Sequence, residues 1–521
     1  MTRFIKYFGV FQKGLLSLIQ MCHIGGALVL ATVVGLVNYD IVARNLFSLP
    51  FLGIEEIVSL GIPIIVFLAT PMQVLSRSLI STDFLVTRST RIIRLGLYSY
   101  SEYFTLLISG IVFLSVVPLF NYAIKNDQFI GVVGVFTMTL WPLKLAILIG
   151  FGLAFVASLF HIGRLICSNR SSSFLVSFCL FIATPIPFYV LSGSASIGLG
   201  AIFLLFLLLL AGVPVVFSLM TAASVGIAVM KGDFLVAANS LGLVVNSAAT
   251  SYVLAAVPFF ILMGLVVGKA NIGRDSLTVA HWLFRSVKGG FGVATVAANT
   301  VFAAITGISI ASAAIFSRVA APPMIELGFT ARFSLGLIAG SSVLGMLIPP
   351  SLLLIIYGVI AEVSINKLFL AAIVPGIILA LMLCATVIIC VLFRLPFAVT
   401  SEYSDVPPKP EKINTILLMM APTLTLLFVV IGGIYGGIFT PTEAGAVGAL
   451  MAIFIALAMK RVTFIQTYNL IKDAAGKTAS ILLMVIAATS FGLMITLSGL
   501  PDIMSSIASG SGLGLTGYVF I

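Results

Sequence analysis

Long apolar runs separated by short polar loops fill this 521-residue chain. We count roughly fourteen to sixteen such runs, some shortened or interrupted, and runs of about 17 residues or more are long enough to cross a bilayer as α-helices. A further helix at about 174–192 and one long helix at about 197–230 follow the first third of the chain. That first third predicts four well-separated helices, at about 14–38, 52–75, 98–121 and 143–166. The pattern therefore predicts an all-α polytopic membrane protein.

The charges support this interpretation. Only 8% of the residues are charged and 61% are hydrophobic, whereas soluble domains carry about 25% charged residues. The net charge of +11 arises from Lys and Arg in short loops, and an excess of these residues is typical of cytoplasmic loops. The loops expected in the cytoplasm contain Arg3, Lys6, Lys13, Arg77, Arg88, Arg91, Arg94, Arg164 and Arg170. We therefore interpret the charge as a sign of membrane orientation and not of nucleic-acid binding.

The chain divides into stretches of different character. The first helices are mostly continuous, whereas small and helix-breaking residues interrupt the apolar runs from residue 199 onward. One polar, proline-rich stretch, "RLPFAVTSEYSDVPPKPEK" (394–412), is the clearest linker signal. The predicted organisation is a four-helix domain, a fusion helix, a first repeat, a cytoplasmic linker and a second repeat, at residues 1–170, 171–198, 199–395, 396–412 and 413–521.

The two halves after residue 199 show faint similarity at an offset of about 221 residues. "FFILMGLVVGKANIG" (259–273) resembles "SILLMVIAATSFGLM" (480–494). Weak symmetry of this kind is typical of internal repeats in secondary transporters. The same offset places Ile521 opposite Thr300, just before the first half's broken segment. We therefore expect the second repeat to be incomplete and the sequence to be a C-terminally shortened form of a longer protein.

Two interrupted apolar runs are the main candidates for a binding site. A broken membrane helix exposes backbone N–H and C=O groups, which is tolerated where the break is buried in protein or lines a cavity. Hydroxyl and carbonyl oxygens suit a hard cation such as Na⁺. The candidates are Thr306, Gly307, Ser309 and Ser312 in "ITGISIASAA" and Pro349, Pro350 and Ser351 in "LIPPSLLL". A simple kink, or close helix packing through small residues, would also explain these residue types.

Two acidic motifs are further candidates. In "TPTEAGAVG", Thr440 and Glu443 match a helix capping box with proline at the first helical position. An acid at the edge of an apolar run can also bind an ion or substrate, so Thr440, Thr442 and Glu443 stay candidates for that role. Glu55 and Glu56 begin the second helix, where they either dock against another domain or remain solvated.

Catalytic and metal-binding motifs are absent from the sequence. There is no phosphate-binding G-x-x-x-x-G-K-[ST], no G-x-S-x-G and no H-E-x-x-H. The five cysteines form no C-x-x-C pair, and the three histidines are scattered. We therefore expect a protein that is not an enzyme and has no cofactor, with only Na⁺ bound as a coupling ion, near Ser309, Ser312 and Ser351.

Several stretches resemble the tripartite ATP-independent periplasmic (TRAP) transporters. Residues 199–521 are similar to the large membrane subunit of that family through "GVPVVFSL", "VPFFILMG", "GMLIPPSLLLIIYG" and "GGIYGGIFTPTEAGAVGAL". Residues 30–90 resemble the small four-helix subunit through "NYDIVARNLFSLPFLGIEEI". The order of the two stretches suggests a natural fusion of both subunits. Ile308 stands where the family usually has serine.

The resemblance implies a function and a set of partners. It implies a multi-pass permease of the bacterial inner membrane that takes up an organic acid with Na⁺ as the coupling ion. A soluble periplasmic binding protein would deliver the substrate. The large subunit would be an elevator-type transport domain built from inverted repeats with re-entrant hairpins, and Glu55 and Glu56 would lie at the subunit interface. An ion-translocating or channel-like membrane subunit of another complex is the alternative, although repeated pore-lining charges are absent.

Overall fold

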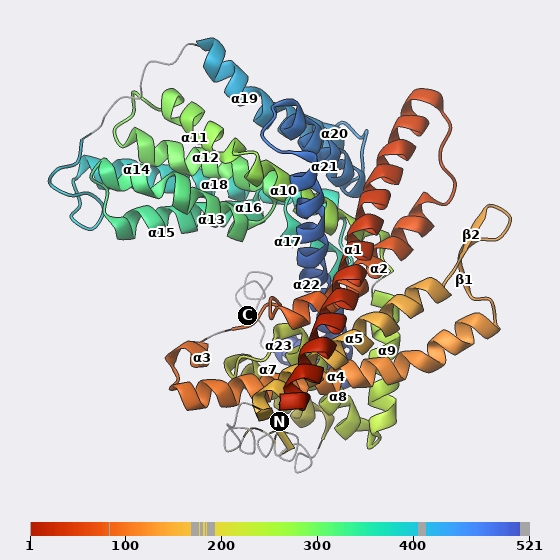
Figure 1. Ribbon diagram of the computed structural model, residues 1–521. Coiled ribbons are helices and arrows are strands. Elements are labelled where there is room, and N and C mark those ends of the chain that lie inside the picture. Colours follow the sequence, from red (N-terminus) through yellow and green to blue (C-terminus); the bar gives the residue numbers. More distant parts are fainter. Residues whose placement is uncertain are drawn as a thin grey trace. The chain divides into compact units, whose positions relative to one another are not determined.

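A computed structural model describes residues 2–82, 84–167, 177, 181–182, 184, 193–248, 250–404 and 413–510 (Figure 1). Within these ranges the chain is helical apart from one small β-hairpin. Nine of the described helices are long and apolar enough to cross a membrane, and a bent pair over 331–360 adds a tenth. Five shorter apolar helices accompany them. The protein is therefore an all-α polytopic membrane protein, as its apolar pattern predicts.

The chain forms two compact units. The first comprises Met1–Val29, Ser59–Ser251 and Thr478–Ile521, as far as these residues are described, and the second comprises Leu30–Val58 and Tyr252–Lys477. The units do not follow the stretches predicted from the sequence, because residues from both sides of the predicted fusion helix contribute to each unit. The predicted fusion helix at 171–198 lies mostly outside the described residues, and Ser194 to Gly198 already belong to the next helix.

The first unit contains the beginning of α1 and the four-helix region. The four predicted helices are present, and α1, α4 and α5 extend beyond the predicted ends. Elements of this unit are α1 (Thr2–Phe47, to Val29), α2 (Ile54–Leu75, from Ser59), α3 (Phe84–Arg88), α4 (Arg91–Lys125), β1 (Phe129–Val132), β2 (Phe136–Thr139), α5 (Trp141–Cys167), α7 (Ser194–Leu210), α8 (Val215–Lys231), α9 (Phe234–Ala248), α22 (Phe464–Leu497, from Thr478) and α23 (Leu500–Gly510).

Small residues allow the helices of this unit to approach closely. A Cβ at Gly152 would lie 3.2 Å from the Phe113 ring, and one at Gly110 would lie 3.2 Å from the Phe155 ring, so α4 and α5 pack antiparallel. The β1–β2 hairpin joins them, with Phe129 opposite Thr139. Helix α4 also packs on α8 and α9. The four-helix stretch therefore shares its core with helices from the following part of the chain.

The prediction of a single long helix at about 197–230 is wrong. The structure has two helices, α7 and α8, that end and begin on either side of residues 211–214. Gly212 has a φ of +83°, and the ring of Pro214 cannot occupy a helix interior without removing a hydrogen bond. The chain therefore doubles back, and a Cβ at Gly226 would lie 3.5 Å from Ala201. The apolar pattern is continuous across this turn, so it conceals the reversal.

The second unit holds the interrupted segments. Its elements are the rest of α1 and the start of α2, η2 (Tyr252–Ala255), α10 (Ala256–Lys269), α11 (Ile272–Leu283), α12 (Gly290–Thr306), α13 (Ser309–Val319), α14 (Ala321–Glu326), α15 (Ala331–Ser342), α16 (Leu344–Leu347), α17 (Leu352–Ile360), α18 (Ile365–Leu392), α19 (Ile413–Leu427), the π-helical turn η3 (Phe428–Gly432), α20 (Gly433–Tyr435), α21 (Pro441–Ala458) and the start of α22.

A buried cluster organises one end of this unit. It joins α12, α14, α15 and α18 and consists of Val293, Val296, Met324, Phe329, Leu337, Val387, Val391 and Val399. Part of the predicted linker belongs to it, because Val399 is buried and the N–H of Thr400 donates to Gly328 O at 2.8 Å. The stretch 396–404 is therefore folded against the α14–α15 turn, whereas 405–412 lie outside the described residues, as do 511–521 at the end of the predicted second repeat.

Candidate functional site

The first predicted break is the tip of a helical hairpin. Helix α12 ends at Thr306, Gly307 has a φ of +64°, Ile308 is extended and α13 begins at Ser309. The rings of Phe302 and Phe316, on opposite sides of the tip, lie 5.7 Å apart, which shows that α13 runs back along α12. The two helices have 17 and 11 residues, and a full crossing needs about 20. The hairpin therefore has the form of a re-entrant segment.

The second predicted break lies between α16 and α17. Ile348 and Ser351 are extended, and the chain bends by 45° between the α15–α16 segment and α17. The Ser351 hydroxyl accepts from the Leu354 N–H at 3.4 Å and donates to Met346 O at 2.6 Å. Ser351 therefore caps α17, and its hydroxyl is hydrogen-bonded to residues on both sides of the break.

The two breaks lie against each other. The Leu352 N–H donates to Gly307 O at 3.4 Å, and a Cβ at Gly307 would lie 3.1 Å from Pro350 O. Thr306 is fully buried and packs on α10, where a Cβ at Gly264 would lie 3.2 Å from Thr306 O. A cavity of about 10 Å³ beside Pro350 is lined by apolar side chains of α10 and α19 and of the end of α12. The structure thus places Gly307 of the first predicted run against Pro350 of the second.

A buried polar network that the sequence analysis missed supports the hairpin. Asn299 on α12 accepts a hydrogen bond from the Ser312 hydroxyl of α13. Its amide donates to the hydroxyls of Ser341 at 2.7 Å and Ser342 at 2.9 Å on α15. All four side chains are buried. Because a buried amide must find partners, Asn299 inside the apolar run "VATVAANTVF" was the available signal.

Ser309 differs from the other candidate hydroxyls. It is buried at the first position of α13, and its side chain makes no hydrogen bond to any described residue. Thr306 by contrast donates to Ala303 O at 3.3 Å in its own helix. Of the predicted hydroxyls at the tip, Ser309 is thus the one without a partner in the described part of the chain.

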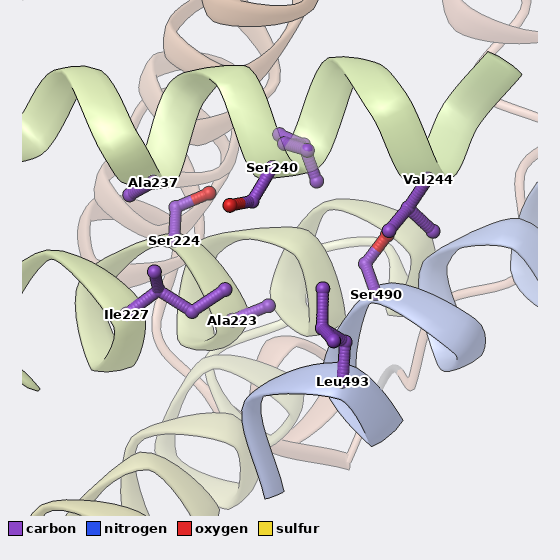
Figure 2. Close-up of a pocket in the computed structure, with 9 residues that line it drawn as sticks. Ala223, Ser224, Ile227, Ala237, Ser240, Val244, Ser490 and Leu493 are labelled. Atoms are coloured by element: carbon purple, nitrogen blue, oxygen red, sulfur yellow. The ribbon is translucent and has the colours of Figure 1, made fainter. Parts of the chain in front are cut away.

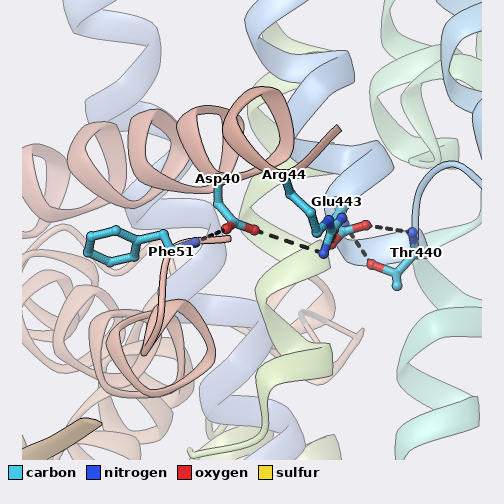
Figure 3. Close-up of polar contacts among 5 residues, drawn as sticks. All are labelled: Asp40, Arg44, Phe51, Thr440 and Glu443. Carbon is cyan, nitrogen blue, oxygen red and sulfur yellow. Dashed lines mark hydrogen bonds and ion pairs between the residues drawn. The ribbon is translucent and has the colours of Figure 1, made fainter. Parts of the chain in front are cut away.

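The acidic motif at 440–443 is a helix cap that also holds an ion pair (Figure 3). The Glu443 N–H donates to the Thr440 hydroxyl at 3.3 Å, and the Thr440 N–H donates to Glu443 Oε2 at 2.9 Å. Arg44 on α1 donates to Glu443 Oε1 at 2.8 Å and lies 3.9 Å from Asp40, which accepts from the Phe51 N–H. Among the hydrogen bonds and ion pairs of the described residues, Glu443 therefore binds Arg44 and Thr440 and no residue of the two breaks.

Thr442 is buried beside this cap, with no contact to the breaks among the described hydrogen bonds. Asp40 and Arg44 were missed in the sequence analysis, although their spacing of four residues in "NYDIVARN" would allow an ion pair on one helix face. Glu55 is exposed and Glu56 half-buried in the first turn of α2, where carboxylates favour the helix dipole. Their role at a subunit interface stays a prediction.

A small space between α8, α9 and α22 in the first unit is not a binding site. Figure 2 shows the side chains of Ser224, Ser240 and Ser490 turned toward it. Each hydroxyl donates to the carbonyl four residues earlier in its own helix, and the space has no room for a water molecule. Small hydroxyl residues here serve close helix packing. Groups of three or more His, Cys, Asp or Glu that could hold a metal are absent from the described ranges.

The fold and the site thus define a class of protein. It is a polytopic membrane protein in which two interrupted helical segments meet at their breaks, and we call this contact the junction. The family model described as "Tripartite ATP-independent periplasmic transporter, DctM component" matches residues 202–521, and the model of the DctQ component matches residues 33–168. The chain therefore belongs to the tripartite ATP-independent periplasmic transporter family, with a DctQ region followed by a DctM region in one chain. It is a multi-pass protein of the bacterial inner membrane.

Several named relatives are similar to this chain. The C4-dicarboxylate TRAP transporter large permease protein DctM of Pseudomonas aeruginosa is 31% identical over 54% of this chain and 65% of its own length. The isethionate TRAP transporter permease protein DctMQ of Oleidesulfovibrio alaskensis is 31% identical over 58% of this chain and 47% of its own length. The sialic acid TRAP transporter large permease protein SiaM of Vibrio cholerae is 32% identical over 59% and 70%.

The chain thus spans about half of the Oleidesulfovibrio protein and just under two thirds of the Pseudomonas protein. The relatives are named as transporter permeases and not as enzymes. This agrees with the absence of catalytic motifs from the sequence, and the chain is classed with the permeases.

Proposed function

We propose that this protein is the membrane permease of a TRAP transporter and takes up an organic acid together with Na⁺. A periplasmic binding protein would deliver the substrate. The observation that carries the proposal is the contact between the hairpin tip at Gly307 and the break at Ile348–Ser351. Family membership supports the transporter class, and the junction supplies a place where solute and ion can bind together.

Helix ends with partial charges of opposite sign meet at this junction. The N-terminal ends of α13 and α17 carry partial positive charge, which favours an anionic substrate group, and at α17 the Leu352 and Leu354 N–H groups already donate to Gly307 O and to the Ser351 hydroxyl. The C-terminal ends of α12 and α16 carry partial negative charge, which favours a cation. Half-helices arranged in this way are the usual substrate and ion sites of secondary transporters. This arrangement supports the proposal that a carboxylate and Na⁺ bind near one another at the junction during transport.

The hydroxyl groups at the junction suit the ion. The hydroxyl groups of Ser312 and Ser351 donate hydrogen bonds to Asn299 and to Met346 O. Each oxygen therefore keeps a lone pair that can bind a cation. Ser309 has a buried hydroxyl that could turn its oxygen toward an ion. We propose that Na⁺ binds near Ser309, Ser312 and Ser351, with carbonyls of the tip as further ligands. Thr440, Thr442 and Glu443 would act less directly, by holding the start of α21.

The names of the relatives support the proposed substrate class. The relatives described above are named for C4-dicarboxylate, isethionate and sialic acid, and their identities to this chain are nearly equal. Similarity to them therefore favours an organic acid without selecting one.

Uptake into proteoliposomes tests the proposal. The full-length protein is reconstituted with its binding protein and a radiolabelled organic acid, and an inward gradient of Na⁺, H⁺ or K⁺ is imposed. We expect accumulation only with the binding protein and the Na⁺ gradient. Equal accumulation under all three gradients would remove the Na⁺ assignment, and uptake without the binding protein would remove the partner.

Two substitutions test whether hydroxyl groups at the junction are responsible for the Na⁺ dependence of uptake. Ser309→Ala and Ser351→Ala remove one candidate oxygen each, so we expect uptake to need a higher Na⁺ concentration while membrane insertion stays normal. Ser317→Ala is the matched control, because Ser317 is on the same hairpin and its hydroxyl bonds its own helix at Ala314 O. Unchanged Na⁺ dependence in both junction variants would show that these hydroxyls serve packing and capping alone.

A further inference from the structure

A polar cleft of about 320 Å³ lies in the first unit, and none of its lining residues belongs to the junction. Its walls come from the end of α2 and the loop after it, from α4 and from the α7–α8 turn. In a protein of which only 8% of the residues are charged, the concentration of polar and charged side chains here needs a reason. The polar lining includes Gln73, Arg77, Tyr98, Ser101, Glu102 and Thr105.

The cleft holds adjacent opposite charges. Arg77 Nη2 lies 2.8 Å from Glu102 Oε1, and His161 Nδ1 lies 2.9 Å from the same oxygen. Glu102 is 6% exposed, whereas the Arg77 side chain is 42% exposed. Both contacts use Oε1, and Oε2 has no hydrogen-bond partner among the described residues. A buried carboxylate therefore keeps one oxygen for a further donor, beside a guanidinium with N–H groups to spare.

The backbone directs Arg77 into this place. Arg77, two residues after the end of α2, has a φ of +52°, a left-handed conformation that residues with a Cβ rarely adopt. Its guanidinium lies 5.1 Å from the centroid of the Tyr98 ring on α4. The Ser101 hydroxyl, on the same helix, has no hydrogen bond to the described part of the chain. Hydrogen-bond donors therefore line the cleft from two elements: the positively charged guanidinium of Arg77 from the loop after α2, and the Ser101 hydroxyl from α4.

The cleft begins at the loop after α2, where phospholipid headgroups are expected, and extends along α4 to Thr105, inside the apolar span that begins at Ile93. Helix α2 ends at Leu75, and the apolar span within α4 begins at Ile93, so residues 76–92 connect two membrane spans. This stretch carries Arg77, Arg88 and Arg91, so the excess of basic residues predicts that it lies on the cytoplasmic side. A ligand with a phosphate and chains in the bilayer could enter from this level.

We propose that the cleft binds the headgroup of a phospholipid that carries a phosphate next to a primary ammonium, as in phosphatidylethanolamine. The phosphate would accept from the exposed N–H groups of Arg77 and from the Ser101 hydroxyl. The ammonium would donate to Glu102 Oε2. A purely anionic headgroup would face the buried carboxylate, and a quaternary ammonium has no N–H to donate to it. The chemistry of the cleft therefore favours this zwitterion.

Lipid binding to the purified, delipidated protein tests the proposal. Native mass spectrometry and thermal unfolding are compared for phosphatidylethanolamine, phosphatidylcholine and phosphatidylglycerol. We expect phosphatidylethanolamine to bind roughly tenfold more tightly than either of the others. Equal binding of all three lipids, or preference for phosphatidylglycerol, would overturn the proposal. Soluble glycerophosphoethanolamine separates the sources: affinity equal to that of the lipid would assign the cleft to a free phosphate ester and overturn the lipid assignment.

Substitutions place the binding in the cleft. Glu102→Gln should remove the preference for phosphatidylethanolamine over phosphatidylcholine, and Ser101→Ala should weaken binding of phosphatidylethanolamine without breaking the ion pair that supports the fold. Arg88→Gln is the control, because Arg88 is exposed in the same loop and stacks on Phe84 outside the cleft. The same affinity in wild type, Glu102→Gln and Ser101→Ala would show that lipid binds elsewhere.

Discussion

At the scale of single residues, the polar side chains of this apolar protein act through partners far away in sequence. Asn299 connects α12 to α13 and α15, and Arg44 connects α1 to the cap of α21. A polar group in such surroundings is costly unless it is hydrogen-bonded, so each of these side chains determines where its partners lie. Their effects can be separated by substitutions that remove one partner at a time.

Asn299→Ala should loosen the hairpin. It removes the acceptor of the Ser312 hydroxyl and the donor to Ser341 and Ser342, and buried groups left unpaired cost about 1–3 kcal/mol. We expect a lower midpoint of thermal unfolding in detergent and loss of uptake. The neighbouring Thr300→Ala is the control, because the Thr300 hydroxyl bonds Val296 O in its own helix. Equal stability of the two variants would contradict a supporting role for the network.

Glu443 combines a cap and an ion pair, which two substitutions distinguish. Glu443→Gln keeps a capping-box residue but loses the charge, and the Arg44 side chain is 40% exposed, so we expect a loss below about 1 kcal/mol. Glu443→Ala also loses the bond from the Thr440 N–H to the Glu443 carboxylate, while the Thr440 hydroxyl still caps the helix, so we expect a further loss of about 0.5–1.5 kcal/mol. A double-mutant cycle of Arg44→Gln with Glu443→Gln, followed by thermal unfolding, measures the pair. Strict additivity would show that the 2.8 Å contact contributes nothing.

At the scale of elements, short helices that end inside the protein create the junction. Helices α13 and α17 have 11 and 9 residues, and their N-terminal ends lie where α12 and α16 finish. Helices this short are marginal by themselves, so their positions depend on tertiary packing. Two constraints act on Gly307. The chain reverses tightly at this residue, and the backbone of Pro350 lies close to it.

Gly307→Ala should therefore separate the tip from the second break. A Cβ at this position meets a φ of +64°, which costs about 1–2 kcal/mol, and lies 3.1 Å from Pro350 O. We expect normal membrane insertion with strongly reduced uptake. Gly336→Ala is the matched control, because a Cβ there meets no atom within 4 Å in α15, and we expect a gain of about 0.5–1 kcal/mol. Full uptake by Gly307→Ala would contradict a site at the junction.

At the scale of the whole molecule, the DctQ and DctM regions are interleaved. Within the second unit, Arg44 and Asn38 of α1 bind Glu443 and Ala446 O of α21. Within the first unit, α4 packs on α8 and α9, and a Cβ at Gly242 would lie 2.8 Å from Ser115. These contacts do not depend on the covalent connection between the regions.

Cleavage of the connection should leave the two regions together. A protease site inserted between the family-model matches at 33–168 and 202–521 allows the purified protein to be cut. We expect both fragments to co-elute in size-exclusion chromatography, because the contacts in each unit remain. Arg44→Gln should weaken this association, whereas Arg88→Gln, exposed outside these contacts, should not. Separation of the wild-type fragments after cleavage would contradict the role of these contacts.

Much of the site could be predicted because its chemistry is local. Proline pairs, glycine and hydroxyl residues inside an apolar run indicate a break wherever they occur, since backbone groups must be paired in lipid. The capping box of Thr440 and Glu443 was predicted and confirmed for the same reason, because all of its bonds lie within four residues. Asn299 and Arg44 were missed because their partners are 13 to 399 residues away.

The amino-acid sequence determined by itself that this is a helical membrane protein, that its apolar runs are interrupted near Gly307 and near Pro350, and to which family it belongs, because hydropathy, turn residues and local motifs act over a few residues. Only the tertiary structure decided that the Gly307 tip meets the Pro350 break, that residues 197–230 turn back on themselves, and that Glu443 binds Arg44. These outcomes depend on the packing of surfaces that are distant along the chain, and a one-dimensional pattern of apolar residues contains no record of which surfaces meet.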